Sequence, residues 1–298
     1  MPKTALILGA NGKIGAHAAT AFRNAGWEVR RYARGTDMTE AAKGCDVIVN
    51  GLNPPNYHNW ARLIPEITAQ VIAAAEASGA TVILPGNVYN FGTAAGPWDE
   101  STPQEPVSRK GRIRVDMEAG YRASGVRTIV LRAGDFIDPD RNGCAMTLIF
   151  LREIRKGRVT AIGDPDVPRT YCYLPDWARA AVLLAENRAR LAIFEDVPFP
   201  GHVFTTMELK DHLEARLGRD LKLARFPWLV MALAAPFWEL AREMREMRYL
   251  YNLPHSLSPK KFNHLLPDFD HASVAQVMEA ALPPDIHPDK PVGSEVLA

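Results

Sequence analysis

The sequence predicts an α/β protein with a doubly wound parallel sheet and a smaller second domain, and three observations support this prediction. Short apolar runs alternate with helix-like segments through the first half of the chain, which is typical of a parallel sheet built from β-α-β units. A glycine-rich turn joins the first apolar run to the first helix-like segment. Two predicted helices end in Asn24-Ala25-Gly26 and Ser78-Gly79, where glycine suits a left-handed C-terminal cap. Strands are expected at residues 5–8, 28–32, 47–50, 81–84 and 128–131, and helices at 14–24, 60–78 and 113–124.

The length and a change in composition predict two domains. At 298 residues the chain is near the size at which single cores stop growing. Residues 1–144 are expected to form the sheet domain, and residues 145–298 mainly a substrate-binding domain. A helix within 174–190 should pack back onto the sheet. The second half has weak strand signals and several prolines; helices are expected at 177–186, 207–217 and 272–281, and irregular chain from residue 283.

The charge and the cysteines limit the classes of partner. The chain has 35 basic and 34 acidic residues and a net charge of +1, which gives no electrostatic footprint for nucleic acid. Three scattered cysteines form neither a disulfide framework nor a zinc-site spacing, which favours a reduced, cytoplasmic setting. The N-terminus runs directly into a predicted strand and lacks the apolar stretch of a signal peptide.

The longest apolar run covers residues 228–238 and is interrupted by Pro236. It is shorter than the roughly 20 residues that span a bilayer, so no integral membrane segment is expected. The pattern becomes amphipathic through Glu246, which predicts a buried or half-buried helix of the second domain. Peripheral membrane contact and a lid over an apolar substrate are the alternatives.

The turn after the first strand predicts a dinucleotide site of the Rossmann type. Gly9 permits the tight turn, Gly12 allows close approach of phosphates, and Gly15 lets the helix pack against the strand. The helix N-terminus then offers unpaired amides to a pyrophosphate. A structural glycine turn in another α/β fold is the alternative. The cofactor-binding candidates of this turn are Gly9, Asn11, Gly12, Lys13, Ile14 and Gly15.

The end of the second strand bears on the choice between NAD and NADP. An NAD site usually has an acidic residue there for the ribose hydroxyls, but Arg30-Arg31-Tyr32-Ala33-Arg34-Gly35 has no carboxylate. Arg34 can instead pair with a 2′-phosphate, so NADP is favoured over NAD. Solvated arginines at a strand end are the alternative. Asp37 is expected to contact the adenine side of the cofactor.

The motifs of the first 190 residues resemble those of extended short-chain dehydrogenases, the NAD-dependent epimerase/dehydratase family. The glycine turn resembles the family's glycine motif, and four further segments resemble its later motifs: Gly44-Cys45-Asp46-Val47-Ile48-Val49-Asn50, Val88-Tyr89, Leu131-Arg132-Ala133-Gly134 and Tyr173-Leu174-Pro175-Asp176-Trp177-Ala178. The resemblance implies hydride chemistry on a small carbonyl or hydroxyl substrate. It also implies possible homodimerisation through the helix that follows Arg112.

The catalytic Ser-Tyr-Lys set of that family is missing. Alignment on Pro106 puts Lys110 at the position of the tyrosine and Arg114 at that of the lysine. Lys110 can take over proton transfer if like charges favour its neutral amine. Alternatively, the domain only senses a cofactor without redox turnover. A third interpretation is a solvated basic helix start, capped by Ser108, with Arg114 paired to Glu118.

The carboxyl ends of the strands supply the remaining candidates, because ligands of open α/β sheets bind there. Asn87 and Tyr89 are expected near the substrate, and Tyr89 can supply the missing hydroxyl; a core tyrosine is the alternative. Further cofactor candidates are Asn50, Gly51, Leu52, Pro85 and Lys110. The eight histidines show no metal-ligand spacing, so no metal is expected. The first hypothesis is an oxidoreductase or epimerase-like enzyme, and the second a cofactor-binding regulator.

Overall fold

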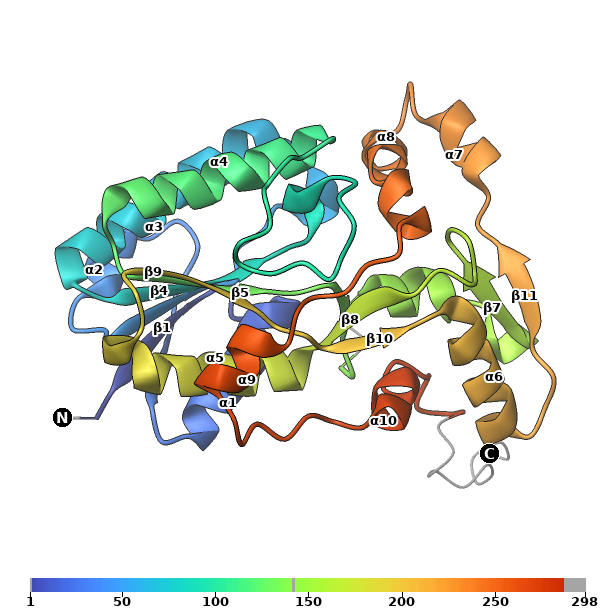
Figure 1. Cartoon of the computed structure of the whole chain (residues 1–298). Helices are drawn as coiled ribbons and strands as arrows, with labels where there is room; N and C mark the ends of the chain where they lie inside the picture. The colour runs from blue at the N-terminus through green and yellow to red at the C-terminus, as the bar shows by residue number, and fades with distance from the viewer. Residues whose placement is uncertain (1, 141–142, 287–298) are drawn as a thin grey trace, which may run out of the picture.

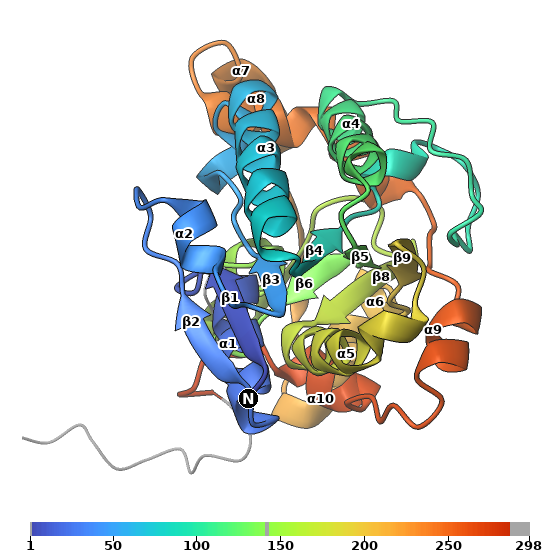
Figure 2. The same cartoon turned by 90° about the vertical axis from the view of Figure 1, so that its left-hand side faces the viewer.

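The computed structural model describes residues 2–140 and 143–286 and confirms the predicted α/β fold. Its main sheet has six parallel strands, with helices on both faces (Figure 1 and Figure 2). In spatial order the strands are β2 (Glu28–Arg31), β1 (Thr4–Leu8), β3 (Val47–Asn50), β4 (Thr81–Gly86), β5 (Thr128–Arg132) and β9 (Phe194–Pro198). The five strands predicted from the sequence are all present.

Alternation along the strands sends side chains to the two apolar layers. Ala5 and Ile7 of β1 belong to the cluster under α1 (Lys13–Asn24) and α5 (Leu174–Asn187). Leu6 and Leu8 belong to the cluster on the opposite face, and both faces are apolar because a parallel sheet is covered on both sides. That second face is covered by α2 (Met38–Ala42), α3 (Trp60–Ser78) and α4 (Arg109–Ser124). In Figure 2, α3 and α4 lie on one side of the sheet and α1 and α5 on the other.

The strand order reverses at β1, and this reversal positions the candidate site. From β1 the chain first adds β2 on one side and then β3 on the other. Leu8 and Asn50 are register partners at the carboxyl ends of β1 and β3, so the turns after these two strands lie side by side. Crevices at such reversals are where open α/β sheets bind ligands.

The second part of the chain forms two small sheets around a separate apolar cluster. A three-stranded sheet has the order β10 (His202–Phe204), β8 (Arg169–Tyr173), β6 (Asp135–Ile137), and a parallel pair joins β7 (Arg158–Ala161) to β11 (Lys222–Arg225). Its helices are α6 (Thr206–Leu217), α7 (Trp228–Ala234), α8 (Glu239–Glu246), α9 (Lys260–Leu265) and α10 (Val274–Glu279). Single turns of 3-10 helix occur at Pro55–Tyr57, Tyr89–Phe91, Ile154–Lys156, Arg188–Arg190 and Arg248–Asn252, and a π turn at Met146–Phe150.

Several boundaries differ from the sequence-based expectation. Residues 174–190 were expected to return to the sheet; in the structure α5 packs on it, β9 forms its edge, and Phe262 of α9 lies in its core. Helix α4 begins at Arg109 rather than at residue 113, because Ser108 caps it: the Ser108 hydroxyl accepts the Gly111 amide at 3.0 Å. The expected irregular tail lies outside the described residues from 287 onward.

The apolar run at 228–238 forms no single buried helix, so that prediction is wrong. Helix α7 ends at Ala234 and α8 begins at Glu239, with Pro236 in the break between them. Leu229 and Phe237 are largely exposed. Among the described residues, the structure has no helix with the length and apolar character that crossing a membrane requires.

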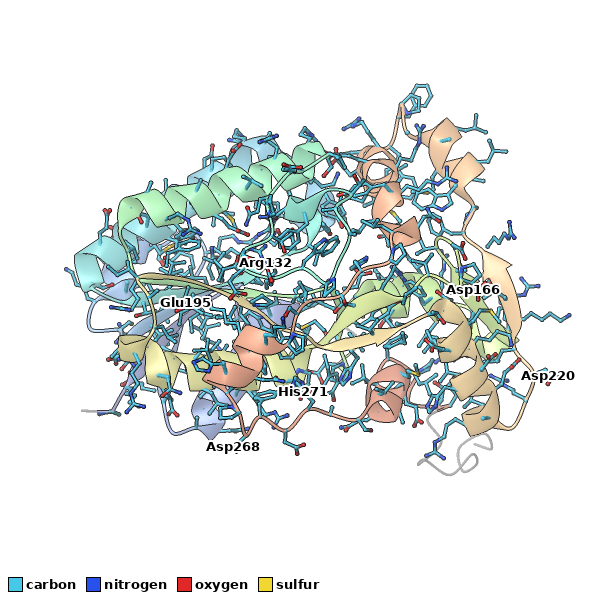
Figure 3. The ribbon with its side chains drawn as sticks, viewed as in Figure 1. Arg132, Asp166, Glu195, Asp220, Asp268 and His271 are labelled. Atoms are coloured by element: carbon cyan, nitrogen blue, oxygen red, sulfur yellow. The ribbon has the colours of Figure 1, made fainter. Side chains whose placement is uncertain are left out.

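A buried ionic network ties four elements of the sheet domain together. Arg132 of β5, labelled in Figure 3, binds both oxygens of Glu118 on α4 at 2.7 and 3.1 Å and both oxygens of Asp196 on β9 at 2.6 and 3.1 Å. Burial opposes its charge, but the two carboxylates raise the pKa of Arg132. A further 2.7 Å bond to the Asn87 carbonyl positions the chain after β4.

Candidate functional site

Three backbone segments, at Gly9, Gly15 and Gly51, meet at the start of α1. They pack so closely that these positions leave no room for a Cβ atom. Gly9 has a left-handed φ of 71°, and a Cβ there would lie 2.9 Å from the Gly51 carbonyl oxygen. A Cβ on Gly15 would collide with the Gly9 carbonyl, and one on Gly51 would lie 2.8 Å from the Leu8 carbonyl oxygen. Glycine at these three positions is therefore needed for the turn itself.

Gly12 differs from these three glycines because its own packing does not require it. Its φ of −87° and ψ of 171° suit any residue, and an added Cβ would meet only the Gly9 carbonyl oxygen, at 3.2 Å. Asn11 and Gly12 are both exposed. Apart from this one tight contact, Gly12 lies on the exposed side of the loop, in front of the first turn of α1.

The start of α1 has the properties of an anion site. Gly12 precedes the helix without a side-chain cap, and the first turn contains no acidic residue. The amides of Lys13, Ile14 and Gly15 have no acceptor within the helix, since they belong to its first turn. Such amides and the helix dipole together bind phosphates, so these residues fit the diphosphate of a dinucleotide.

The side chains of the loop have their own contacts. Lys13 Nζ donates to the Gly143 carbonyl at 2.9 Å and thereby links the loop to the segment after β6. Ile14 packs against the apolar cluster under α1. Both residues are therefore best placed to offer a ligand their main-chain amides.

The end of β2 presents two exposed arginines without a side-chain partner among the described residues, Arg31 and Arg34. Arg30 instead donates to the Ala41 and Lys43 carbonyls at 2.9 and 2.8 Å. Asp37 caps α2, with Oδ1 accepting the Thr39 and Glu40 amides, so its carboxylate already serves a structural purpose.

The turn after β3 is shaped by Asn50. Its Oδ1 accepts the Leu52 amide at 3.2 Å, and its Nδ2 donates to the Tyr121 hydroxyl on α4 at the same distance. Leu52 packs against the apolar cluster on the α3 and α4 side. Asn50, Gly51 and Leu52 thus form the wall of the crevice opposite the glycine loop.

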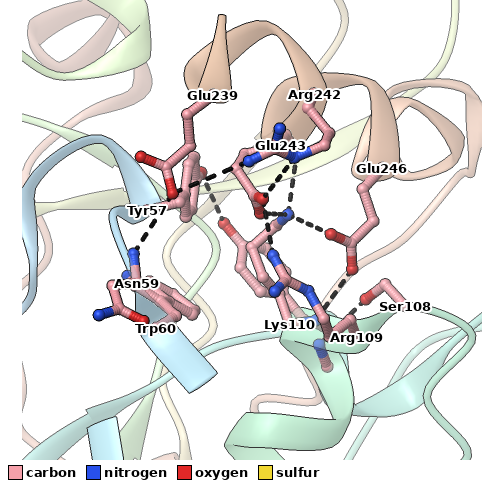
Figure 4. A network of polar contacts seen from close by, with 12 residues as sticks. Tyr57, Asn59, Trp60, Ser108, Arg109, Lys110, Glu239, Arg242, Glu243 and Glu246 are labelled. Carbon is pink, nitrogen blue, oxygen red and sulfur yellow. Dashed lines mark hydrogen bonds and ion pairs between the residues drawn. The ribbon is translucent and has the colours of Figure 1, made fainter. Parts of the chain in front are cut away.

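The environment of Lys110 differs from the sequence-based expectation. Its fully buried ammonium donates to Glu243 Oε2 at 2.7 Å, to Glu246 Oε2 at 2.6 Å and to the Glu243 carbonyl at 3.0 Å (Figure 4). These three bonds use all three donors of an ammonium group. Opposite charges surround the amine, so the proposed activation by like charges has no basis here. Lys110 joins α4 to α8.

Arg114 also has partners other than those expected. Its guanidinium donates to Asn53 Oδ1 at 3.1 Å and lies 4.8 Å from the ring centroid of Trp60. Glu118, its predicted partner, is bound to Arg132 instead. Burial lowers the pKa of Arg114.

A second polar group lies beyond the end of β4, and we call Tyr57, Tyr89, Asp135, Arg169 and Tyr251 the tyrosine cluster. The hydroxyls of Tyr57 and Tyr89 lie 3.3 Å apart. Arg169 Nη1 donates to Asp135 Oδ2 at 3.1 Å, and its guanidinium lies 5.3 Å from the Tyr251 ring centroid. Tyr89 and Asn87 come from the same turn, where Asn87 Oδ1 accepts the Tyr89 amide at 3.0 Å; Pro85 precedes them on β4.

Burial keeps the tyrosines of this cluster protonated. It raises the pKa of Tyr89 well above its usual value, and the neighbouring Tyr57, Tyr251 and Asp135 raise it further. Burial likewise raises the pKa of Tyr57 and of Tyr251. Both Tyr57 and Tyr89 therefore present neutral hydroxyls through the neutral pH range.

Sequence reasoning did not identify Tyr57, Asp135 or Arg169 as site residues. Tyr57 lies in a loop where Asn56, Tyr57 and Asn59 all have positive φ, at 54°, 61° and 48°. Such left-handed non-glycine residues are uncommon and concentrate at functional sites, but nothing in the residue types reveals them beforehand. Asp135 directly follows Leu131-Arg132-Ala133-Gly134, which is the one available signal.

One group of described residues has a geometry that could hold a metal ion: His17, Asp138 and Asp140. His17 Nε2 is 2.9 Å from Asp138 Oδ1, a direct hydrogen bond. This bond satisfies the imidazole without an ion.

A doubly wound sheet with a glycine loop at its reversal defines the dinucleotide-binding class of α/β folds. Solved structures of similar fold cover nearly the whole chain. UDP-glucose 4-epimerase from Brucella ovis, in complex with NAD, is 15% identical over 93% of this chain and 97% of its own, with a TM-score of 0.72. UDP-glucuronic acid 4-epimerase from Bacillus cereus, in complex with UDP-glucuronic acid and NAD, is 15% identical over 93% and 97%, with a TM-score of 0.70.

A third neighbour is an NAD-dependent NDP-hexosamine 5,6-dehydratase involved in tunicamycin biosynthesis, 14% identical over 94% of this chain and 96% of its own, with a TM-score of 0.69. No family model and no curated protein sequence matches the chain. The chain thus has the fold of NAD-dependent nucleotide-sugar epimerases and dehydratases, at identities that show the fold alone.

The contacts of Lys110 predict a structural effect of its removal. Lys110→Met leaves the buried Glu243 carboxylate with its 2.6 Å contact to Arg109 and a 3.7 Å ion pair with Arg242. The free energy of unfolding should fall by about 3 kcal/mol in urea titrations. Arg109→Met is the control, because Arg109 binds the same carboxylate but is 53% exposed, and it should cost less than about 1 kcal/mol. Equal losses from the two variants would contradict this assignment.

Proposed function

We propose that this protein is an NAD(P)-dependent oxidoreductase or epimerase/dehydratase-like enzyme that acts on a small carbonyl or hydroxyl substrate. The observation that carries the proposal is the uncapped start of α1 next to the exposed Gly12, at the reversal of the strand order. Backbone amides there can hold the cofactor's diphosphate. The similar fold of NAD-bound epimerases supports the same location.

The tyrosine cluster is the proposed place of proton transfer. The bound nicotinamide would supply hydride chemistry. Tyr89 presents a neutral hydroxyl beyond the end of β4, next to the expected position of the substrate oxygen, and can donate a hydrogen bond or a proton to it. Tyr57 lies 3.3 Å from that hydroxyl and orients it. Because the raised pKa of Tyr89 keeps it protonated, its role is that of an acid rather than of a base.

The substrate is proposed to be polar and to contact the ion pair of the cluster. Asp135 and Arg169 join β6 to β8, so they extend the site from the main sheet into the second domain. The Bacillus cereus neighbour binds UDP-glucuronic acid, which favours a nucleotide sugar as the substrate class here. The neighbours reported above are enzymes and give no support to the regulator alternative.

Two further features belong to the proposal. Homodimerisation through α4 is proposed because the side chains of Arg112, Asp116, Ala119 and Arg122 are exposed along the helix. A cytoplasmic location is proposed because Cys45, Cys144 and Cys172 are all free and buried, as expected of a protein that keeps its thiols reduced.

Substitution at Gly12 tests cofactor binding without disturbing the turn. Gly12→Ala adds a Cβ where the diphosphate would approach, so the affinity for NADPH and NADH in calorimetric titrations should fall at least about tenfold. Gly120→Ala on α4 is the control, because its Cβ would meet only a Thr68 methyl at 3.8 Å. The thermal midpoints of both variants should stay near that of the unchanged protein. Failure of the unchanged protein to bind either dinucleotide would overturn the proposal.

Substitution of Arg34 tests the preference for NADP. Arg34→Ala should weaken NADPH binding by about tenfold and leave NADH binding unchanged, because only NADPH carries the 2′-phosphate. Arg152, which is also exposed but lies in the second part of the chain, gives the control Arg152→Ala. Equal affinities of the unchanged protein for the two cofactors would contradict the preference.

Removal of a single oxygen tests the role of Tyr89. Tyr89→Phe should lower the turnover of nucleotide-sugar or carbonyl substrates by about 100-fold, with the affinity for the dinucleotide unchanged. Tyr57→Phe should lower turnover less, since that residue only positions Tyr89. A Tyr89→Phe variant with full turnover would exclude the hydroxyl from the chemistry.

A further inference from the structure

Five large apolar side chains are exposed on α7 and in the turn that follows it. We call them the apolar tip: Leu229, Val230, Leu233, Phe237 and Trp238. Phe237 is 94% exposed, Leu229 75% and Leu233 72%. Monomeric proteins rarely expose contiguous apolar patches of this kind without a binding function.

The apolar tip is held in place from behind. On the opposite face of α7, Met231 is buried and packs with Ala235 and with Ala241 of α8. Helix α8 is fastened in turn to α4 by Lys110 and to the loop before α3, where Glu239 Oε2 lies 2.8 Å from His58 Nδ1. In Figure 1, α7 and the turn to α8 lie at the edge of the molecule, away from the main sheet. The exposed face of α7 therefore belongs to an anchored element.

The exposed charged residues of segment 222–248 are basic: Lys222, Arg225, Arg242, Arg245 and Arg248. Of these, Arg242 lies 3.7 Å from Glu243 and 4.0 Å from Glu239. The three glutamates of the segment are bound to partners, Glu239 to His58, and Glu243 and Glu246 to Lys110. No charged residue stands between Arg225 and Glu239. An apolar surface bordered by cations is complementary to an anionic lipid surface.

We propose that the apolar tip is a peripheral membrane-binding element that inserts into the interface of a bilayer containing anionic lipids. Tryptophan and phenylalanine are suited to the boundary between headgroups and acyl chains, and arginines pair with lipid phosphates. A second copy of the chain is a poorer occupant, because a two-fold symmetric contact through this surface would bring the same arginines together. This role is independent of the dinucleotide site.

Vesicle co-sedimentation of the full chain tests the proposal. The protein should sediment with vesicles of phosphatidylcholine mixed with phosphatidylglycerol, less with phosphatidylcholine alone, and less again at high salt. Phe237→Ser should weaken binding to the mixed vesicles by about tenfold. The control is Ile193→Ser, at an apolar residue 57% exposed on another part of the surface, and it should bind as the unchanged protein does. Gly12→Ala should also bind normally.

Three results would overturn the proposal. The first is no sedimentation with the mixed vesicles. The second is equal binding by the unchanged protein and Phe237→Ser, with the thermal midpoint of the variant confirming that it is folded. The third is a dimer in light scattering that Phe237→Ser converts to a monomer, without vesicle binding, which would assign the apolar tip to a second copy of the chain.

Discussion

The close approach of three backbone segments at the reversal of the strand order is the constraint on which the rest of the site depends. Gly9, Gly15 and Gly51 each lack a Cβ that would strike the main chain of a neighbouring segment. Their contact sets the distance between the ends of β1 and β3 and the start of α1. Gly12 has an ordinary φ and would place an added Cβ 3.2 Å from the Gly9 carbonyl oxygen; its exposed position at the uncapped start of α1 is what fits a ligand there.

Helix α8 also organises the site, because it contacts parts of the chain that are distant in sequence. Lys110 binds it at the start of α4, and the loop that carries Tyr57 is bound to it through His58. Lys110, which the sequence resemblance aligns with a tyrosine, thus holds α8 against α4. The same contacts keep the left-handed loop in place, and that loop brings the Tyr57 hydroxyl to Tyr89.

The parts predicted from the sequence are those that local signals determine. Strands β1, β3, β4 and β5 are largely apolar and buried, whereas β2 is an edge strand of polar and charged residues around Val29. The glycine turn is specified by backbone geometry. Strands β6 and β8 were not predicted, because Asp135 and Arg169 interrupt them with charges that are compensated only by each other. The environment of Lys110 could not be predicted from the sequence either, because its partner Glu243 lies 133 residues further along the chain. A charge pair of that separation leaves no local pattern.

The protonation of the tyrosines in the tyrosine cluster limits the proton transfers that these residues can carry out. The family that the sequence resembles uses a tyrosine whose pKa is lowered by a lysine. Here Arg114 stands at the aligned lysine position, Lys110 is saturated by carboxylates, and burial raises the pKa of Tyr89. A tyrosine of that kind gives up a proton only to a strong base, such as an oxygen that becomes an alkoxide as a carbonyl is reduced. Abstraction of a hydroxyl proton needs a different group, and the carboxylate of Asp135 is the one that the cluster contains. Under the proposed function, the tyrosine cluster thus supplies a proton donor, Tyr89, and one carboxylate, Asp135, which is paired with Arg169.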